Sequence, residues 1–278
     1  ITPVILLVLY ATFLAKVFKD SFNGAIEGAL SGGFVVNNLE GIINGTVGGQ
    51  LVSSLLAVSC VTVAFCSNLT MISDKVTGAR KDLLTSPVRR SSLAIAYFCA
   101  SLLSTLIISY VTTAAGLVYL AFTGWYLSFG DVLLIILDVF LLTSFGVALS
   151  SVINAFLSTS AQASAVGTIV SAGYGFVCGA YMPISQFGEG LRNFLGFLPG
   201  TYGTSIIRNH ALAGVFREMS AQNFPAEAIE GIKDSVDCNL YFFGAKVSEA
   251  AAYGVLVGSV LLLIGAFVLI NVLRKKRS

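Results

Sequence analysis

The sequence predicts an all-α protein that crosses a membrane several times. One reason is scarcity of charge: 16 Lys and Arg with 14 Asp and Glu make 11% of 278 residues, whereas a soluble domain carries roughly 25%. A second reason is distribution, because five stretches hold no charge at all: 1–15, 41–73, 91–130, 139–188 and 250–273. So apolar a composition excludes a soluble or disordered chain. A net charge of +2 without a basic face argues against nucleic-acid binding.

Six spans are expected, because a helix needs about 20 apolar residues to cross ~30 Å of hydrocarbon. They are placed at about 1–18, 47–72, 93–121, 131–155, 161–181 and 250–273. The first begins at Ile1 without a Met, so we expect the native protein to extend upstream. The fourth uncharged stretch is too long for one helix and is divided at the polar cluster between Ser150 and Gln162. The whole chain, 1–278, is expected to be a single transmembrane domain.

Basic residues predict the orientation, because Lys and Arg accumulate in cytoplasmic loops. Nine of the sixteen lie in two places, the loop between the second and third spans and the tail: Lys75, Arg80, Lys81, Arg89, Arg90, Arg274, Lys275, Lys276 and Arg277. An even number of crossings puts both places on one side. Both termini are therefore expected in the cytoplasm.

The segment 184–249 is expected outside. Apolar residues recur at helical spacing from Phe187 to Leu198, Pro199-Gly200 interrupts the pattern, and a second helix is expected from about Tyr202 to Phe216. These two short pieces predict a helical hairpin that enters the outer half of the membrane. The alternative is a pair of surface helices lying on the bilayer.

Few residues suggest chemistry inside the spans. Asp138 is either a polar contact in a transport path, an interhelical pair, or a carboxylate close enough to the outer surface to reach headgroup water. Gly173, Tyr174 and Phe176 lie among small residues of the fifth span and could line a path. His210 is the single histidine, which leaves no multi-His metal site, and its spacing from Ser205 does not favour a Ser–His hydrolase. We therefore expect no catalytic residue and no bound metal.

The loop 73–90 carries the most distinctive pattern. Asp74 is followed four residues later by Gly78, then by a short helix that ends at Ser86-Pro87. This resembles the coupling segment of type-2 ABC exporter permeases, in the drug- and antibiotic-export-like branch. Further along, Pro183, the turn Phe197–Tyr202 and Ile207-Arg208 are similar to that family's external hairpin. Asp74 stands where the family uses Glu, and the amphipathic helix that the family has before its first span is not in the sequence.

The resemblance implies the membrane subunit of an ABC exporter, driven by ATP, that moves an amphipathic or hydrophobic substrate outward. The sequence has no phosphate-binding loop of the form GxxxxGK[ST], so ATP and Mg²⁺ are expected on a separate ATP-binding subunit and no cofactor on this chain. A second permease chain, identical or related, and membrane lipid are the other expected partners. The expected location is a bacterial plasma membrane.

The resemblance also implies roles for individual residues. Those expected to couple to the ATPase are Asp74, Lys75, Thr77, Gly78, Arg80, Lys81 and Asp82. Those expected in an external gate are Pro183, Pro199, Gly200, Tyr202 and Arg208. The path is expected to be lined by the second and fifth spans. Two other functions stay open: a secondary transporter or channel driven by an ion gradient, which would depend on Asp138, and a membrane-anchored sensor.

Overall fold

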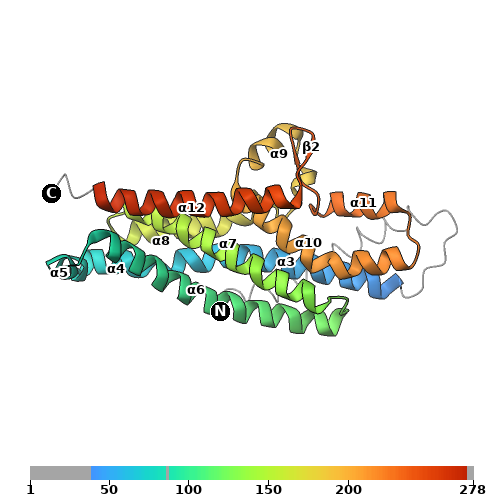
Figure 1. The fold of residues 1–278 in the computed structure, drawn as a ribbon, viewed down its shortest axis with the longest axis horizontal. Helices are drawn as coiled ribbons and strands as arrows, with labels where there is room; N and C mark the ends of the chain where they lie inside the picture. Colours follow the sequence, from blue (N-terminus) through green and yellow to red (C-terminus); the bar gives the residue numbers. More distant parts are fainter. Residues whose placement is uncertain (1–38, 86–87, 274–278) are drawn as a thin grey trace.

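The computed structural model describes residues 39–85 and 88–273, which form an elongated helical bundle that carries a two-stranded sheet (Figure 1). In chain order its elements are α3 (Leu39–Ser67), α4 (Leu69–Thr77), α5 (Ala79–Thr85), α6 (Arg90–Thr123), α7 (Phe129–Phe156), α8 (Ser160–Val177), the 3-10 helix η2 (Ile184–Gln186), α9 (Glu189–Leu195), α10 (Pro199–Ala221), α11 (Ala226–Ser235), β1 (Tyr241–Phe242), β2 (Ala245–Lys246) and α12 (Glu249–Leu273). The strands pair antiparallel, with Tyr241 opposite Lys246. The predicted first span and the basic tail lie outside the described residues.

Four stretches of the described chain are long and apolar enough to cross a membrane: Leu39–Thr77, Ser91–Thr123, Phe129–Phe156 and Glu249–Leu273. They correspond to the predicted second, third, fourth and sixth spans. α8 forms where the fifth span is predicted, but it has only 18 residues, many of them small or polar, and is not one of the four. An all-α polytopic membrane protein is consistent with these helices.

α3 begins at Leu39, eight residues before the predicted start of the second span near Val47. Five of the residues between these positions are polar or small, Glu40, Gly41, Asn44, Gly45 and Thr46, which argues against lipid contact. In the structure Gly45 and Thr46 face protein instead, and the Thr46 hydroxyl donates to the carbonyl of Ile42 at 2.8 Å. A helix enclosed by other helices does not need an apolar surface on every side.

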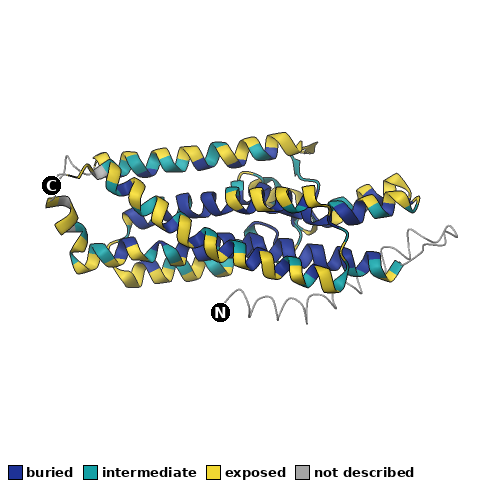
Figure 2. Cartoon of the chain, turned by 60° about the horizontal axis from the view of Figure 1, so that its bottom comes forward, coloured by how far each residue is buried: buried dark blue, intermediate teal, exposed yellow. Residues whose placement is uncertain are grey.

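α3 lies at the centre of the bundle and packs against α6, α7, α8 and α10. It is buried along nearly its whole length. α6 and α12 form part of the periphery and expose large apolar side chains, among them Leu103, Val111, Phe122 and Leu262. Figure 2 shows the buried segments inside the bundle and the exposed ones along its outer helices. This pattern suits a bundle whose outer surface meets lipid.

Two helices form on either side of the break predicted at Pro199-Gly200, but their lengths differ from the prediction. α9 has seven residues and is mostly exposed, whereas α10 has 23, starts at Pro199 rather than near Tyr202, and runs past Phe216. Proline suits a first helical position, where its missing N–H has no partner to lose. α10 packs against α3, α7 and α12 and is largely buried. The surface-helix alternative therefore fails for α10.

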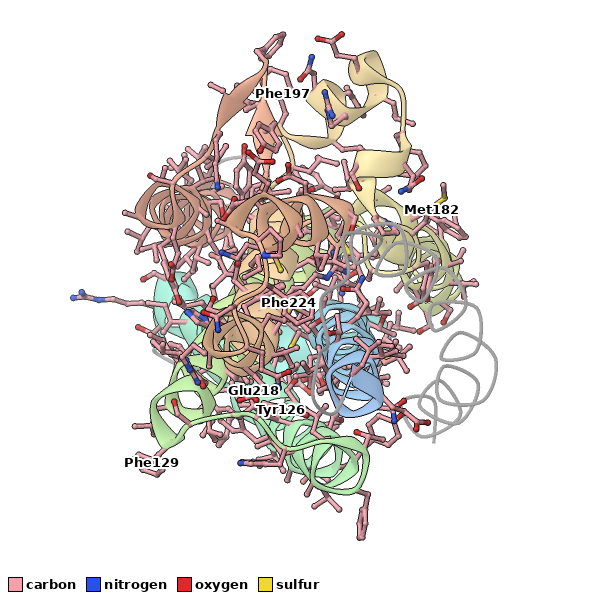
Figure 3. All side chains as sticks on the ribbon, turned by 90° about the vertical axis from the view of Figure 1, so that its right-hand side faces the viewer. Tyr126, Phe129, Met182, Phe197, Glu218 and Phe224 are labelled. Carbon is pink, nitrogen blue, oxygen red and sulfur yellow. The ribbon has the colours of Figure 1, made fainter. Side chains whose placement is uncertain are left out.

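A small aromatic and ionic cluster joins the segments around the sheet. Phe197, which lies apart from the main bundle in Figure 3, stacks edge-on against Phe242 with 5.0 Å between ring centroids. Lys246 on β2 and Lys233 on α11 both contact the Glu230 carboxylate. Hydrogen bonds from these two lysines lower the pKa of Glu230 to about 2. This cluster holds β2 against α11.

Candidate functional site

α4 and α5 lie at the same end of the bundle as the C-terminal end of α12 (Figure 1). Gly78 separates the two helices in a left-handed conformation, with φ = +91°, which costs glycine little and other residues considerably more. The single short helix expected in this loop is therefore two, although α5 does end at Thr85, just before Ser86-Pro87. We call α4 and α5 together the coupling pair, residues 69–85.

Two charged residues of the coupling pair are bonded to spanning helices. The Tyr97 hydroxyl on α6 donates to the Asp74 carboxylate at 2.7 Å. The Arg80 guanidinium donates to the side-chain oxygen of Asn271 on α12 at 2.8 Å. The sequence predicted Arg80 as a polar contact for the ATPase, but in this structure its guanidinium reaches α12 of the same chain. These contacts tie the coupling pair to α6 and α12.

Lys75 provides a third tie, because its ammonium donates to the backbone carbonyl of Leu157, just after α7. The exposed residues of the pair include Val76, Thr77, Asp82 and Leu83. Val76 is 54% exposed and Leu83 is 43% exposed. Lys81 lies outside the side chains that the structure describes.

An apolar cavity of about 540 Å³ lies between α7, α8, α12 and the start of α10. The predicted residues Gly173, Tyr174, Pro199 and Gly200 all line it. The approach of α8 to α10 is close here: a Cβ at Gly200 would lie only 2.5 Å from the Tyr174 hydroxyl oxygen. α3 contributes no lining residue, so the expected role of the second span in the path has no support from this cavity.

Phe176 is not among the residues that line this cavity. Its ring is 56% exposed and packs edge-on against Tyr181, with 5.1 Å between centroids. Tyr202 lies instead beside a smaller cavity of about 130 Å³, and its hydroxyl donates to the Gly196 carbonyl at 2.6 Å. Pro183 directly precedes η2. The predicted gate residues therefore do not form one cluster.

Asp138 is only 1% exposed, so the interpretation that it reaches headgroup water is wrong. Its carboxylate lies 2.5 Å from Nδ1 of His210 on α10 and accepts from the Tyr253 hydroxyl on α12, also at 2.5 Å. Nε2 of His210 lies 3.2 Å from the Glu249 carboxylate. The interhelical-pair interpretation of Asp138 is the one that the geometry supports.

Arg208 is completely buried, with 0% exposure, and its guanidinium joins segments far apart in the chain. It donates to the carbonyls of Gly179 and Val236, both at 2.8 Å, and to the Ser54 hydroxyl on α3 at 3.1 Å. The Asp237 carboxylate lies 3.6 Å away and accepts from the Ser185 backbone N–H at 2.9 Å. Arg208 is therefore a buried residue that connects α3 and α10 to the segments around Gly179 and Val236.

The profile of the ABC-2 type transporter family matches residues 1–211, about three quarters of the chain. The chain belongs to the ABC-2 type transporter family. It is thus a transmembrane permease component of an ABC transporter, which works generally with an ABC ATP-binding subunit, and not the ATP-binding subunit itself. A search of curated proteins found no match.

Several residues of this ABC-2 permease were not identified as functional from the sequence. Val76 and Leu83 are apolar residues within a charged loop, and that contrast was a usable signal of an exposed contact surface. Tyr97 and Asn271 lie 23 and 191 residues from their partners Asp74 and Arg80, and no local pattern relates them. His210 was recognised as the single histidine, but its pairing with Asp138 depends on how α7 and α10 cross.

Proposed function

We propose that this ABC-2 permease is the membrane subunit of an ATP-driven exporter that moves an amphipathic or hydrophobic compound outward across the plasma membrane. A separate subunit hydrolyses ATP and holds Mg²⁺. The observation that supports this most is the coupling pair, which exposes Val76 and Leu83 while two of its charged residues, Asp74 and Arg80, are bonded to spanning helices. An exposed apolar surface among charged residues is suited to a protein partner.

The ties to α6 and α12 give the coupling pair a mechanical role. A partner that grips Val76 and Leu83 would displace Asp74 and Arg80, and these residues would pull on Tyr97 of α6 and Asn271 of α12. Packed helices respond to such displacement by moving as rigid bodies rather than by deforming. When ATP drives two ATPase subunits to close, this movement would be transmitted through the coupling pair to two permease chains. This assignment places the C-terminal end of α12 in the cytoplasm.

The cargo class follows from the cavity between α7, α8, α10 and α12. Its volume of about 540 Å³ lies within the range of roughly 300–1,000 Å³ typical of small-molecule sites. Apolar residues such as Phe145, Leu149 and Leu262 dominate the lining. Hydrophobic or amphipathic compounds that partition into lipid would enter such a cavity.

Changing Val76 and Leu83 to Asp is expected to uncouple the transporter. Both side chains are exposed, so the chain should still insert, but the contact with the ATPase would lose its apolar centre. In proteoliposomes that contain both subunits, cargo export and cargo-stimulated ATP hydrolysis should fall about tenfold or more. Val88→Asp is the matched control, because Val88 is 46% exposed and lies just outside the coupling pair.

Reversing the charges with Asp74→Lys and Arg80→Glu tests the ties themselves. We expect this variant to insert and to keep its ATPase subunit, yet to export poorly, because the coupling pair would no longer pull on α6 and α12. Wild-type export and wild-type stimulation of ATP hydrolysis in both variants would refute the proposed function of the pair.

Filling the apolar cavity is expected to reduce export without loss of stability. Gly173 has open space where a Cβ would lie, so Gly173→Leu projects into the cavity without a clash. Export of a bulky hydrophobic compound should fall about tenfold, whereas basal ATP hydrolysis should persist. Gly167→Leu on the same helix also meets open space but lies outside the lining, and it should export normally. Equal export by the two variants would show that the cavity is not on the route.

A further inference from the structure

The cluster of Asp138, His210, Tyr253 and Glu249 connects three helices where α12 begins. α7 provides Asp138, α10 provides His210, and α12 provides Glu249 and Tyr253. The C-terminal end of α12 lies with the coupling pair, so this first turn of α12 faces the opposite, external side. The coupling mechanism proposed above does not use these four residues.

The hydrogen-bonding requirements of the cluster imply a bound proton. Imidazole donates at both nitrogens only when it is protonated. Nδ1 of His210 is 2.5 Å from one carboxylate and Nε2 is 3.2 Å from another. Tyr253 already donates to Asp138, and an ionised carboxylate can only accept. Both contacts of His210 are satisfied only if the cluster holds one proton more than a neutral ring with two carboxylates.

The burial of the two carboxylates determines which contact of His210 is broken when the cluster loses its proton. The Asp138 side chain is 1% exposed and could not be solvated by water, so it keeps the single remaining N–H of His210. The Glu249 side chain is 59% exposed and can turn to solvent. Its carboxylate would then face a ring nitrogen that carries a lone pair. The contact between α10 and the first turn of α12 is therefore the one that opens.

The external solution has access to the cluster. A cavity of about 410 Å³ lies between α10, the sheet and the start of α12, and Ser205, Asn209, Lys246 and Glu249 contribute to its lining. Glu249 thus belongs both to this cavity and to the buried contact with His210. Protons from the external side can reach the site through it.

The charged groups on the other elements near α10 do not act on the cluster. α3, which also packs against α10, carries one charged residue, Glu40, in its first turn. On α11, Lys233 pairs with Glu230, which also pairs with Lys246. Within residues 39–85 and 88–273, the titratable groups that act on His210 are Asp138 on α7 and Glu249 on α12, with Tyr253 bonded to Asp138.

We propose that Asp138, His210, Tyr253 and Glu249 form a proton-binding site open to the external solution, and that loss of its proton releases the first turn of α12 from α10. An alkaline exterior then loosens the outer half of the bundle, and an acidic exterior closes it. The site requires neither the cargo nor ATP, so it can be tested independently of the proposed export.

Hydrogen exchange measured by mass spectrometry tests the site, with the full chain and its ATPase in lipid nanodiscs from pH 5.5 to 9. After correction for the intrinsic rate, protection of residues 249–256 in the wild type should fall about tenfold as pH rises, as expected for one lost charge-assisted hydrogen bond. In His210→Gln the protection should not depend on pH. Glu227→Gln, an exposed change on α11, should keep the wild-type titration.

Glu249→Gln keeps the test decisive if His210→Gln folds poorly. This variant alters an exposed side chain and removes one carboxylate, so a neutral His210 satisfies Asp138 and the titration should disappear. Wild-type protection that does not change with pH would overturn the proposal. A pH profile in Glu249→Gln that matches the wild type would overturn it as well.

Discussion

Arg208→Met is expected to destabilise severely the part of the permease around α10, Gly179 and Asp237. The substitution keeps much of the side-chain volume but leaves the Asp237 carboxylate without its cationic neighbour and the carbonyls of Gly179 and Val236 without their donor. Removing one partner of a buried ion pair costs about 3–5 kcal/mol. The yield of folded protein in membranes and the midpoint of thermal denaturation in detergent should both fall strongly.

Arg217 offers a matched comparison on the same helix. Its guanidinium contacts Asp131 on α7, but its side chain is 53% exposed. An exposed ion pair contributes about 0–1 kcal/mol, so Arg217→Gln should denature near the wild-type temperature. Adding Asp237→Asn to Arg208→Met should restore part of the lost stability, because it removes the stranded charge. Equal losses in Arg208→Met and Arg217→Gln would contradict the role of Arg208 as a buried tie.

Asn68→Leu is expected to weaken the junction where α3 meets α4. Asn68 is completely buried, and its amide donates to the hydroxyls of Ser150 at 2.6 Å and Ser151 at 2.8 Å on α7. Its side-chain oxygen accepts from Ser101 on α6 at 2.9 Å. Leucine cannot replace any of these bonds, and we expect a loss of about 2–4 kcal/mol, since each stranded polar group costs about 1–3 kcal/mol and the hydroxyls recover part by bonding locally.

This second variant should also affect coupling, because Asn68 directly precedes α4. Thermal denaturation in detergent measures its stability, and export by the reconstituted complex measures its coupling. Ser104→Ala is the control, since Ser104 is exposed on α6 and bonds only to the Ala100 carbonyl of its own helix. If Asn68→Leu denatured and exported like Ser104→Ala, the polar junction would have no structural role.

Which features could be predicted from the sequence depends on the range of the interactions involved. The helices α6, α7 and α12 follow from long apolar stretches without charge, which a membrane requires whatever the neighbouring helices do. The end of α5 follows from Ser86-Pro87, because the residue before a proline avoids helical geometry. The start of α3 could not be predicted in this way, because its first turns mix polar with apolar residues, and only contact with other helices buries residues such as Thr46.

The candidate site shows the same division. The coupling pair could be located because its residues are contiguous and their order resembles a family pattern. The direction of its side chains could not be, since Asp74 meets Tyr97 and Arg80 meets Asn271 only after the helices pack. Asp138 is the clearest case: its distance from the helix start suggested headgroup water, whereas His210 and Tyr253 enclose it.

The sequence by itself determined that this protein is an all-α membrane chain, where most of its spans lie, and which loop resembles a coupling segment. These properties depend on composition and on neighbours along the chain, because lipid selects long apolar helices and charges mark their ends. Only the tertiary structure decided that Arg208 and Asp138 are buried, which residues they bond, and which helices enclose the apolar cavity. Those properties depend on how α7, α8, α10 and α12 cross, and helices packed in a membrane bring together residues that no sequence spacing relates.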